Sequence, residues 1–136
     1  MIRPINRDQT WLQRVAKPAT PKDTAVITDL QDTLRAHQDH CVGMAANMIG
    51  SDRRIIIAQL GPMAIPMINP QIIEKHDPYL TTEGCLSLSG QRQTKRYRSI
   101  TLQYLDARFQ PQQQTFNDYF AQIVQHECDH CDGILI

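Results

Sequence analysis

The chain has 136 residues, 41% of them hydrophobic, and its 14 Lys and Arg residues balance its 14 Asp and Glu residues to a net charge of zero. This length is sufficient for one hydrophobic core, so we expect a single domain over residues 1–136. The neutral balance provides no overall basic surface, and we expect no direct contact with nucleic acid.

The N-terminal segment and the cysteines indicate the compartment. Residues 1–14 lack the apolar run of a signal peptide, and no stretch approaches the roughly 20 apolar residues of a membrane span. Four cysteines without a secretory signal are typical of thiols in a reducing compartment rather than of a disulfide framework. We therefore expect a cytoplasmic protein that contacts no membrane and whose thiols are free to bind metal.

The predicted helices and strands follow one another in an irregular order. Thr20, Pro21 and Asp23 form a capped helix start, which predicts an amphipathic helix over about residues 21–38. A last helix is expected from about residue 117 to 131, with Gly133 as its C-terminal stop. Few helices and several strands without a regular βαβ alternation favour an α+β domain. The strands are predicted from β-branched content and alternation at residues 54–60, 64–73 and 99–105.

The last helix contains a His-Glu-x-x-His motif that begins at His126. At about 100° per residue, His126 and His130 lie about 40° apart around the helix and one turn apart along it, so both imidazoles point to one place. Glu127 lies roughly 60° to 100° from them, where its carboxylate reaches a metal-bound water without replacing a ligand. The motif predicts a catalytic metal site with Glu127 as general base; the alternative is a helix that happens to contain two histidines.

A third metal ligand must come from another segment, because catalytic sites usually combine three protein ligands with an open water position. Cys85 is the best candidate, since Gly84 beside it allows a close backbone approach and a thiolate is a strong ligand for zinc or ferrous iron. The alternative for Cys85 is an ordinary small core residue. Cys128 and Cys131 point roughly 120° to 180° away from the histidine face and are predicted to be buried core thiols. The remaining histidines are expected to be structural: His37, His40 and His76.

Three segments, in this order, resemble the peptide deformylase family. Residues 41–48 (CVGMAANM) are similar to the family's G-x-G-x-A-A-x-Q segment, residues 83–87 (EGCLS) match its second segment, and residues 125–130 (QHECDH) match its third. The resemblance covers the chain from about residue 40 to its end. It implies the family's fold, an α+β domain of short antiparallel or mixed strands packed around a C-terminal metal-binding helix.

The resemblance also implies a role for each residue of the site. Cys85, His126 and His130 would hold one divalent metal ion per chain, Fe2+ or Zn2+, with water as the fourth ligand. Glu127 would move a proton from that water to the leaving amine, and the backbone N–H of Leu86 would donate to the developing oxyanion. The family removes the formyl group from N-formylmethionyl peptides, so the implied partner is an N-terminal formyl peptide, ribosome-associated nascent chains included. The residues implied for substrate binding are Val42, Gly43 and Gly84 along its backbone and Tyr119, Gln122 and Ile123 around its methionine side chain.

The chain departs from the family pattern at positions that bear on activity. Met48 stands where the family has a glutamine whose amide joins the oxyanion hole, and Cys41 replaces the first glycine. Gln122 makes the methionine pocket more polar than the family's usual one. We therefore expect a metal-dependent amide hydrolase of the deformylase type with weak or altered activity. The alternatives are a hydrolase of another small amide and a non-catalytic metalloprotein that binds peptide N-termini.

Overall fold

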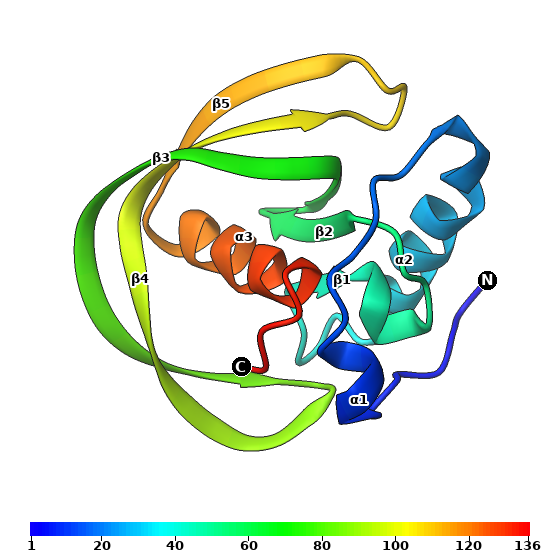
Figure 1. Cartoon of the computed structure of the whole chain (residues 1–136), viewed down its shortest axis with the longest axis horizontal. Coiled ribbons are helices and arrows are strands. Elements are labelled where there is room, and N and C mark those ends of the chain that lie inside the picture. Colours follow the sequence, from blue (N-terminus) through cyan, green and yellow to red (C-terminus); the bar gives the residue numbers. More distant parts are fainter.

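The architecture, described by a computed structural model over all residues 1–136, is one antiparallel sheet that bends around a C-terminal helix (Figure 1). The five strands lie in the order β1-β2-β3-β4-β5. None of the helices combines the length and the apolar character that a membrane-spanning helix needs. The elements are α1 (Gln9–Leu12), the 3-10 turn η1 (Pro21–Asp23), α2 (Thr24–Ala36), β1 (Gly43–Ala45), the 3-10 turn η2 (Ala46–Ile49), β2 (Ile55–Leu60), β3 (Met63–Cys85), β4 (Leu88–Leu105), β5 (Pro111–Asn117) and α3 (Asp118–Cys131).

Both long helices begin and end close to their predicted positions. The capping box at the start of the first is present: the Thr20 hydroxyl accepts from the Lys22 N–H at 3.3 Å, and the Asp23 carboxylate accepts from the Thr20 N–H at 2.8 Å. Its first turn is 3-10 rather than α-helical, and α2 ends at Ala36. Helix α3 follows its N-cap Asn117 directly, and Gly133 takes the left-handed conformation (φ 75°) just past its end.

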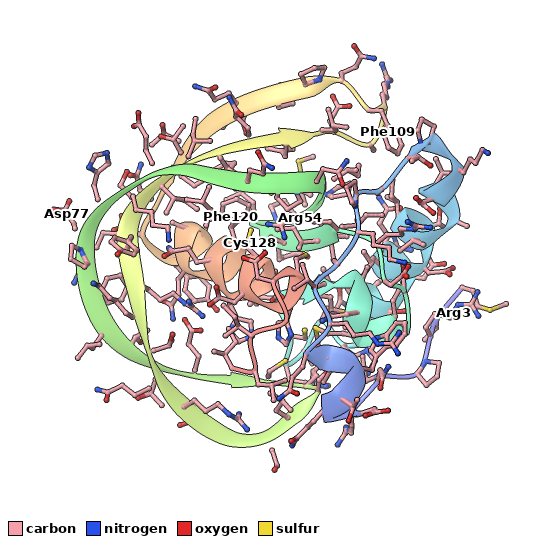
Figure 2. The ribbon with its side chains drawn as sticks, viewed as in Figure 1. Arg3, Arg54, Asp77, Phe109, Phe120 and Cys128 are labelled. Carbon is pink, nitrogen blue, oxygen red and sulfur yellow. The ribbon has the colours of Figure 1, made fainter.

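Two of the three predicted strands are longer than the sequence patterns indicated. Strand β2 coincides with the prediction, but the segments 64–73 and 99–105 are only the inner parts of β3 and β4. Beyond them the two strands continue as a two-stranded ribbon, paired as far as Cys85 and Leu88, that arches around α3 in Figure 1. Its side chains are mostly polar and exposed, as for Asp77 at the outer edge in Figure 2. Pairing between β3 and β4, rather than an alternation of apolar and polar residues, keeps the backbone of the ribbon extended. Strand β1, strand β5 and helix α1 were not predicted.

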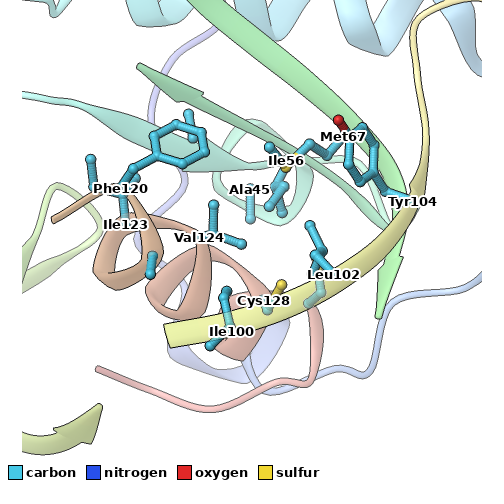
Figure 3. Packing of buried hydrophobic residues seen from close by; sticks show 13 residues of the cluster. Ala45, Ile56, Met67, Ile100, Leu102, Tyr104, Phe120, Ile123, Val124 and Cys128 are labelled. Atoms are coloured by element: carbon cyan, nitrogen blue, oxygen red, sulfur yellow. The ribbon is translucent and has the colours of Figure 1, made fainter. Parts of the chain in front are cut away.

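Two hydrophobic clusters lie on opposite faces of the sheet. Alternation along β2 points Ile56 toward α3 and Ile55 and Ile57 toward α2, so this strand is buried on both faces, which explains its unbroken apolar run. The cluster under α3 also contains Cys128 and Cys131, 3% and 1% exposed, so the prediction of core thiols is confirmed (Figure 3). Packing of this face holds α3 in a fixed rotation, with its histidines turned toward the end of β3.

Candidate metal centre and substrate cleft

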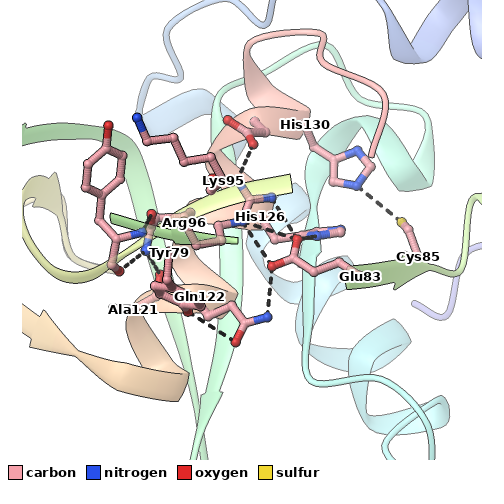
Figure 4. A network of polar contacts seen from close by, with 12 residues as sticks. Tyr79, Glu83, Cys85, Lys95, Arg96, Ala121, Gln122, His126 and His130 are labelled. Atoms are coloured by element: carbon pink, nitrogen blue, oxygen red, sulfur yellow. Dashed lines mark hydrogen bonds and ion pairs between the residues drawn. The ribbon is translucent and has the colours of Figure 1, made fainter. Parts of the chain in front are cut away.

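The end of β3 and the last turns of α3 bring a thiol and two imidazoles together. One ligand atom each from Cys85, His126 and His130 lies within 4.8 Å of the others. The Cys85 Sγ is 3.2 Å from the His130 Nε2, as drawn in Figure 4, and the two imidazole centroids are 5.1 Å apart. The helical spacing therefore places both histidines as predicted, and β3 supplies the cysteine. Such a donor set suits Zn2+ or Fe2+.

A buried carboxylate, that of Glu83, contacts the His126 ring on the side away from Cys85. The His126 Nδ1 donates to the Glu83 Oε1 at 2.7 Å, which leaves its Nε2 toward Cys85 for a metal ion. Burial favours the neutral imidazole, but the neighbouring Cys85 and Glu83 outweigh it and raise the pKa of His126 to about 10. Burial, with the charges of His126 and Arg96, lowers the pKa of His130 to about 3, so that this ring is neutral. Binding of a cation would thus release a proton from His126.

Glu83 is in turn held by an arginine from the neighbouring strand. The Arg96 Nη2 and Nε donate to the two Glu83 carboxylate oxygens at 2.7 and 3.0 Å, and its Nη1 donates to Asp129 of α3 at 2.6 Å (Figure 4). Burial alone would raise the pKa of Glu83, but the hydrogen bonds from His126 and Arg96 lower it to about 2. Sequence reasoning missed this network. Glu83 and Asp129 lie inside the recognised segments, but their link through Arg96 depends on strand register.

Glu127 presents a carboxylate that has no hydrogen-bond partner. Its side chain is 5% exposed, and its Oε1 is buried and unpaired. Burial raises the pKa of Glu127 to about 7. A Cβ added to Gly43 would lie 2.8 Å from its Oε2 and 2.8 Å from the Ile123 Cγ2, so a larger residue at position 43 would displace these groups. An orphaned acceptor beside the ligand cluster fits the predicted place of a metal-bound water.

A cleft of about 480 Å³ opens next to these groups, between β1, the end of β3 and α3. Leu86 lines this cleft. His40 also lines it, although it was expected to be structural, and it does not belong to the ligand cluster. His37 instead contacts the Thr33 carbonyl at 2.9 Å, and His76 is exposed. All residues predicted for substrate binding line the cleft: Val42, Gly43, Gly84, Tyr119, Gln122 and Ile123.

The residues that depart from the family pattern also border the cleft. Met48 is 1% exposed and lines it, and its Sδ accepts from the Ala45 N–H at 3.4 Å. Asn47 faces the opposite way, where its Nδ2 donates to the His130 carbonyl at 2.9 Å, so it supplies no donor in place of Met48. Burial raises the pKa of Cys41 to about 12, and its thiol donates to the Gly43 carbonyl at 3.1 Å.

Fold and site together define a metal-dependent hydrolase. A family model described as polypeptide deformylase matches residues 2–136, and the chain belongs to the peptide deformylase family. A peptide deformylase of Clostridium beijerinckii is 52% identical over 136 residues, which cover both chains completely. A class I type b peptide deformylase from Acinetobacter baumannii, with Met-Ala-Ser bound, superposes with a TM-score of 0.89 at 28% identity over 99% of this chain and 97% of that one.

A second solved structure supports the same assignment. The peptide deformylase from Thermotoga maritima superposes with a TM-score of 0.90 at 27% identity, over 99% of this chain and 95% of that chain. The family resemblance and the predicted fold class are therefore confirmed, and the activity they support is peptide deformylation by a metal-dependent hydrolase.

Proposed function

We propose that Cys85, His126 and His130 hold one divalent ion, Fe2+ or Zn2+, and that the adjoining cleft removes formyl groups from N-formylmethionyl peptides at a reduced rate. The observation that carries this proposal is the juxtaposition of the three ligand atoms, all within 4.8 Å, with the unpaired carboxylate of Glu127. The substrates would be N-terminal formyl peptides in the cytoplasm, ribosome-associated nascent chains included.

Each step of the reaction falls to a group that borders the cleft. A bound ion would supply Lewis acidity and lower the pKa of a coordinated water. Glu127 takes the proton from the attacking water and delivers it to the leaving amine as the formamide C–N bond breaks, which gives formate and a free N-terminus. The backbone N–H of Leu86 donates to the oxygen on which negative charge develops. Backbone groups of Val42, Gly43 and Gly84 align the peptide as an added strand.

The ligand assignment is tested by metal content. Cys85→Ala should abolish tight binding of the ion and formate release together, because two imidazoles remain from a three-ligand set. Cys131→Ala is the matched control, since that thiol lies in the core under α3, and it should keep the full metal stoichiometry. Elemental analysis of both purified variants decides the matter. Full metal content without Cys85, or loss of metal without Cys131, would contradict the assignment.

The reduced rate is attributed to Met48. Met48→Gln should raise kcat by up to about 10²- to 10³-fold with little change in KM, because a donor aimed at the oxyanion acts mainly in the transition state. In the variant, the glutamine Oε1 would take the place of Sδ as acceptor for the Ala45 N–H, which would leave its NH2 group for the cleft. Met48→Leu, which adds no donor, should show no gain. A gain below about threefold for Met48→Gln with the metal site intact would mean that position 48 does not face the oxyanion.

The main alternative is a protein that binds peptide N-termini without turnover, and Met48 is the observation that favours it. Formyl-Met-Ala-Ser, acetyl-Met-Ala-Ser and free Met-Ala-Ser separate the possibilities. Formate from the first peptide alone supports deformylation, and acetate from the second indicates a broader amide hydrolase. Binding of all three without release of either acid would support the binding function.

A further inference from the structure

Gln122 places a polar group in the part of the cleft assigned to the first side chain of the substrate. The residues predicted around that side chain, Tyr119, Gln122 and Ile123 of α3, all line the cleft. Ile123 and the Tyr119 ring offer apolar surface, but Gln122 offers a carboxamide. A few polar groups on an otherwise apolar wall decide which ligand atoms a cleft accepts.

A hydrogen bond to Glu83, together with a longer contact from Tyr79, orients the Gln122 carboxamide. Its Nε2 donates to the Glu83 Oε2 at 2.9 Å, and the Tyr79 hydroxyl donates to its Oε1 at 3.5 Å (Figure 4). A carboxamide nitrogen carries two N–H groups, and Glu83 takes only one of them. Gln122 lines the cleft and its Nε2 donates no other hydrogen bond, so the second N–H is available to a ligand.

The charge of Glu83 does not dominate this wall. Its two oxygens already accept from Arg96 at 2.7 and 3.0 Å, from His126 at 2.7 Å and from Gln122 at 2.9 Å. A cationic side chain would find these acceptor positions occupied, and an acidic one would face a carboxylate. The group that suits the spare donor of Gln122 is thus a neutral acceptor.

We propose that this cleft selects formyl peptides whose first side chain has the length of methionine and ends in a neutral hydrogen-bond acceptor, with methionine sulfoxide as the preferred residue. The inference rests on the proposed deformylase function, which makes the first residue a form of methionine. A thioether sulfur is a weak acceptor, whereas the sulfoxide oxygen is a strong one on a side chain of the same length. The Gln122 amide offsets the hydration that this oxygen loses, which an apolar wall could not do.

The experiment measures ratios between substrates on the metal-loaded protein. Formyl-Xaa-Ala-Ser peptides carry methionine, norleucine, glutamine or either sulfoxide epimer as the first residue. We expect kcat/KM for one sulfoxide epimer to exceed that for methionine by about five- to tenfold, the effect of one hydrogen bond. In Gln122→Leu the preference should reverse. Loss of the Gln122 contact to Glu83 would slow all substrates alike. The ratio of kcat/KM for the sulfoxide peptide to that for the methionine peptide therefore isolates the effect on selectivity.

Binding of the deformylated peptides is a second, independent measurement. Calorimetry with Met-Ala-Ser and its sulfoxide tests the same preference without turnover. Absence of formate from every peptide would refute the proposed catalysis, but the calorimetric comparison would still test the selectivity. Gln122→Met serves if Gln122→Leu fails to fold. Preference of the native protein for methionine or norleucine over both sulfoxide epimers would overturn the inference, and so would an unchanged ratio in the Gln122 variants.

Discussion

Glu127→Gln should lower kcat for formate release by about 10²-fold or more while metal content and peptide affinity stay in place. Glu127 is not one of the three clustered ligands, and its Oε1 is buried without a partner, so no structural contact of that oxygen is lost. The amide has the shape of the carboxylate but cannot take a proton from water. The measurements are kcat under saturating formyl peptide, elemental analysis, and calorimetric binding of Met-Ala-Ser.

Glu127→Asp is the matched control for this variant. It keeps a proton acceptor but withdraws it by one methylene from the cleft, so kcat should fall between those of the native protein and Glu127→Gln. Turnover in Glu127→Gln equal to that of the native protein would exclude the proton-transfer role. Loss of the metal ion from Glu127→Gln would instead indicate that the carboxylate helps to hold it.

Arg96→Met should destabilise the protein by about 3 kcal/mol, because it removes the arginine from the buried carboxylate of Glu83 and leaves His126 as the only cationic partner of that carboxylate. Arg96 is 3% exposed and joins β4 to β3 through Glu83 and to α3 through Asp129. Urea unfolding of the metal-free forms measures the difference. Arg98→Met is the control, since Arg98 is exposed and lies over the Tyr79 ring at 4.6 Å, and it should cost less than about 1 kcal/mol. A loss below about 1 kcal/mol for Arg96→Met would show that the pair is not needed for stability.

The loss of unfolding free energy caused by Arg96→Met should also depend on pH. The pKa of Glu83 is about 2 in the folded protein against 4.5 for an unperturbed glutamate, so its pairing contributes stability that is fully present above pH 4.5 and is lost as pH falls through 2. The difference in unfolding free energy between the two proteins should therefore narrow from pH 5 to pH 2. A difference that grows over this range would contradict the assigned direction of the Glu83 pKa.

The sequence predicted the parts of the molecule that depend on local periodicity. Helical spacing alone was sufficient to bring His126 and His130 together and to place Cys128 in the core, because α3 is a regular helix with one buried face. The resemblance of three short segments was sufficient to select Cys85, which lies beside the two histidines, and to identify the family. These predictions need no knowledge of which strand pairs with which.

The parts that escaped prediction depend on contacts between distant segments. The polar ribbon of β3 and β4 has no apolar alternation, and Glu83 pairs with Arg92 in register while its side chain reaches Arg96. That contact depends on the pairing of the two strands, which no pattern along either strand indicates.

The distance along the chain between Cys85 and His130 has a consequence for the unfolded state. Cys85, at the end of β3, lies 45 residues before His130, and an ion bound by both would close that loop as a covalent crosslink does. Such a closure lowers the entropy of the unfolded chain, by an amount worth about 3–4 kcal/mol for a disulfide across a loop of this length. A chain whose four cysteines are all free would obtain from its catalytic ion the kind of stabilisation that secreted proteins obtain from disulfides. Loss of the ion would then expose the protein to proteolysis at the moment at which it ceases to be active.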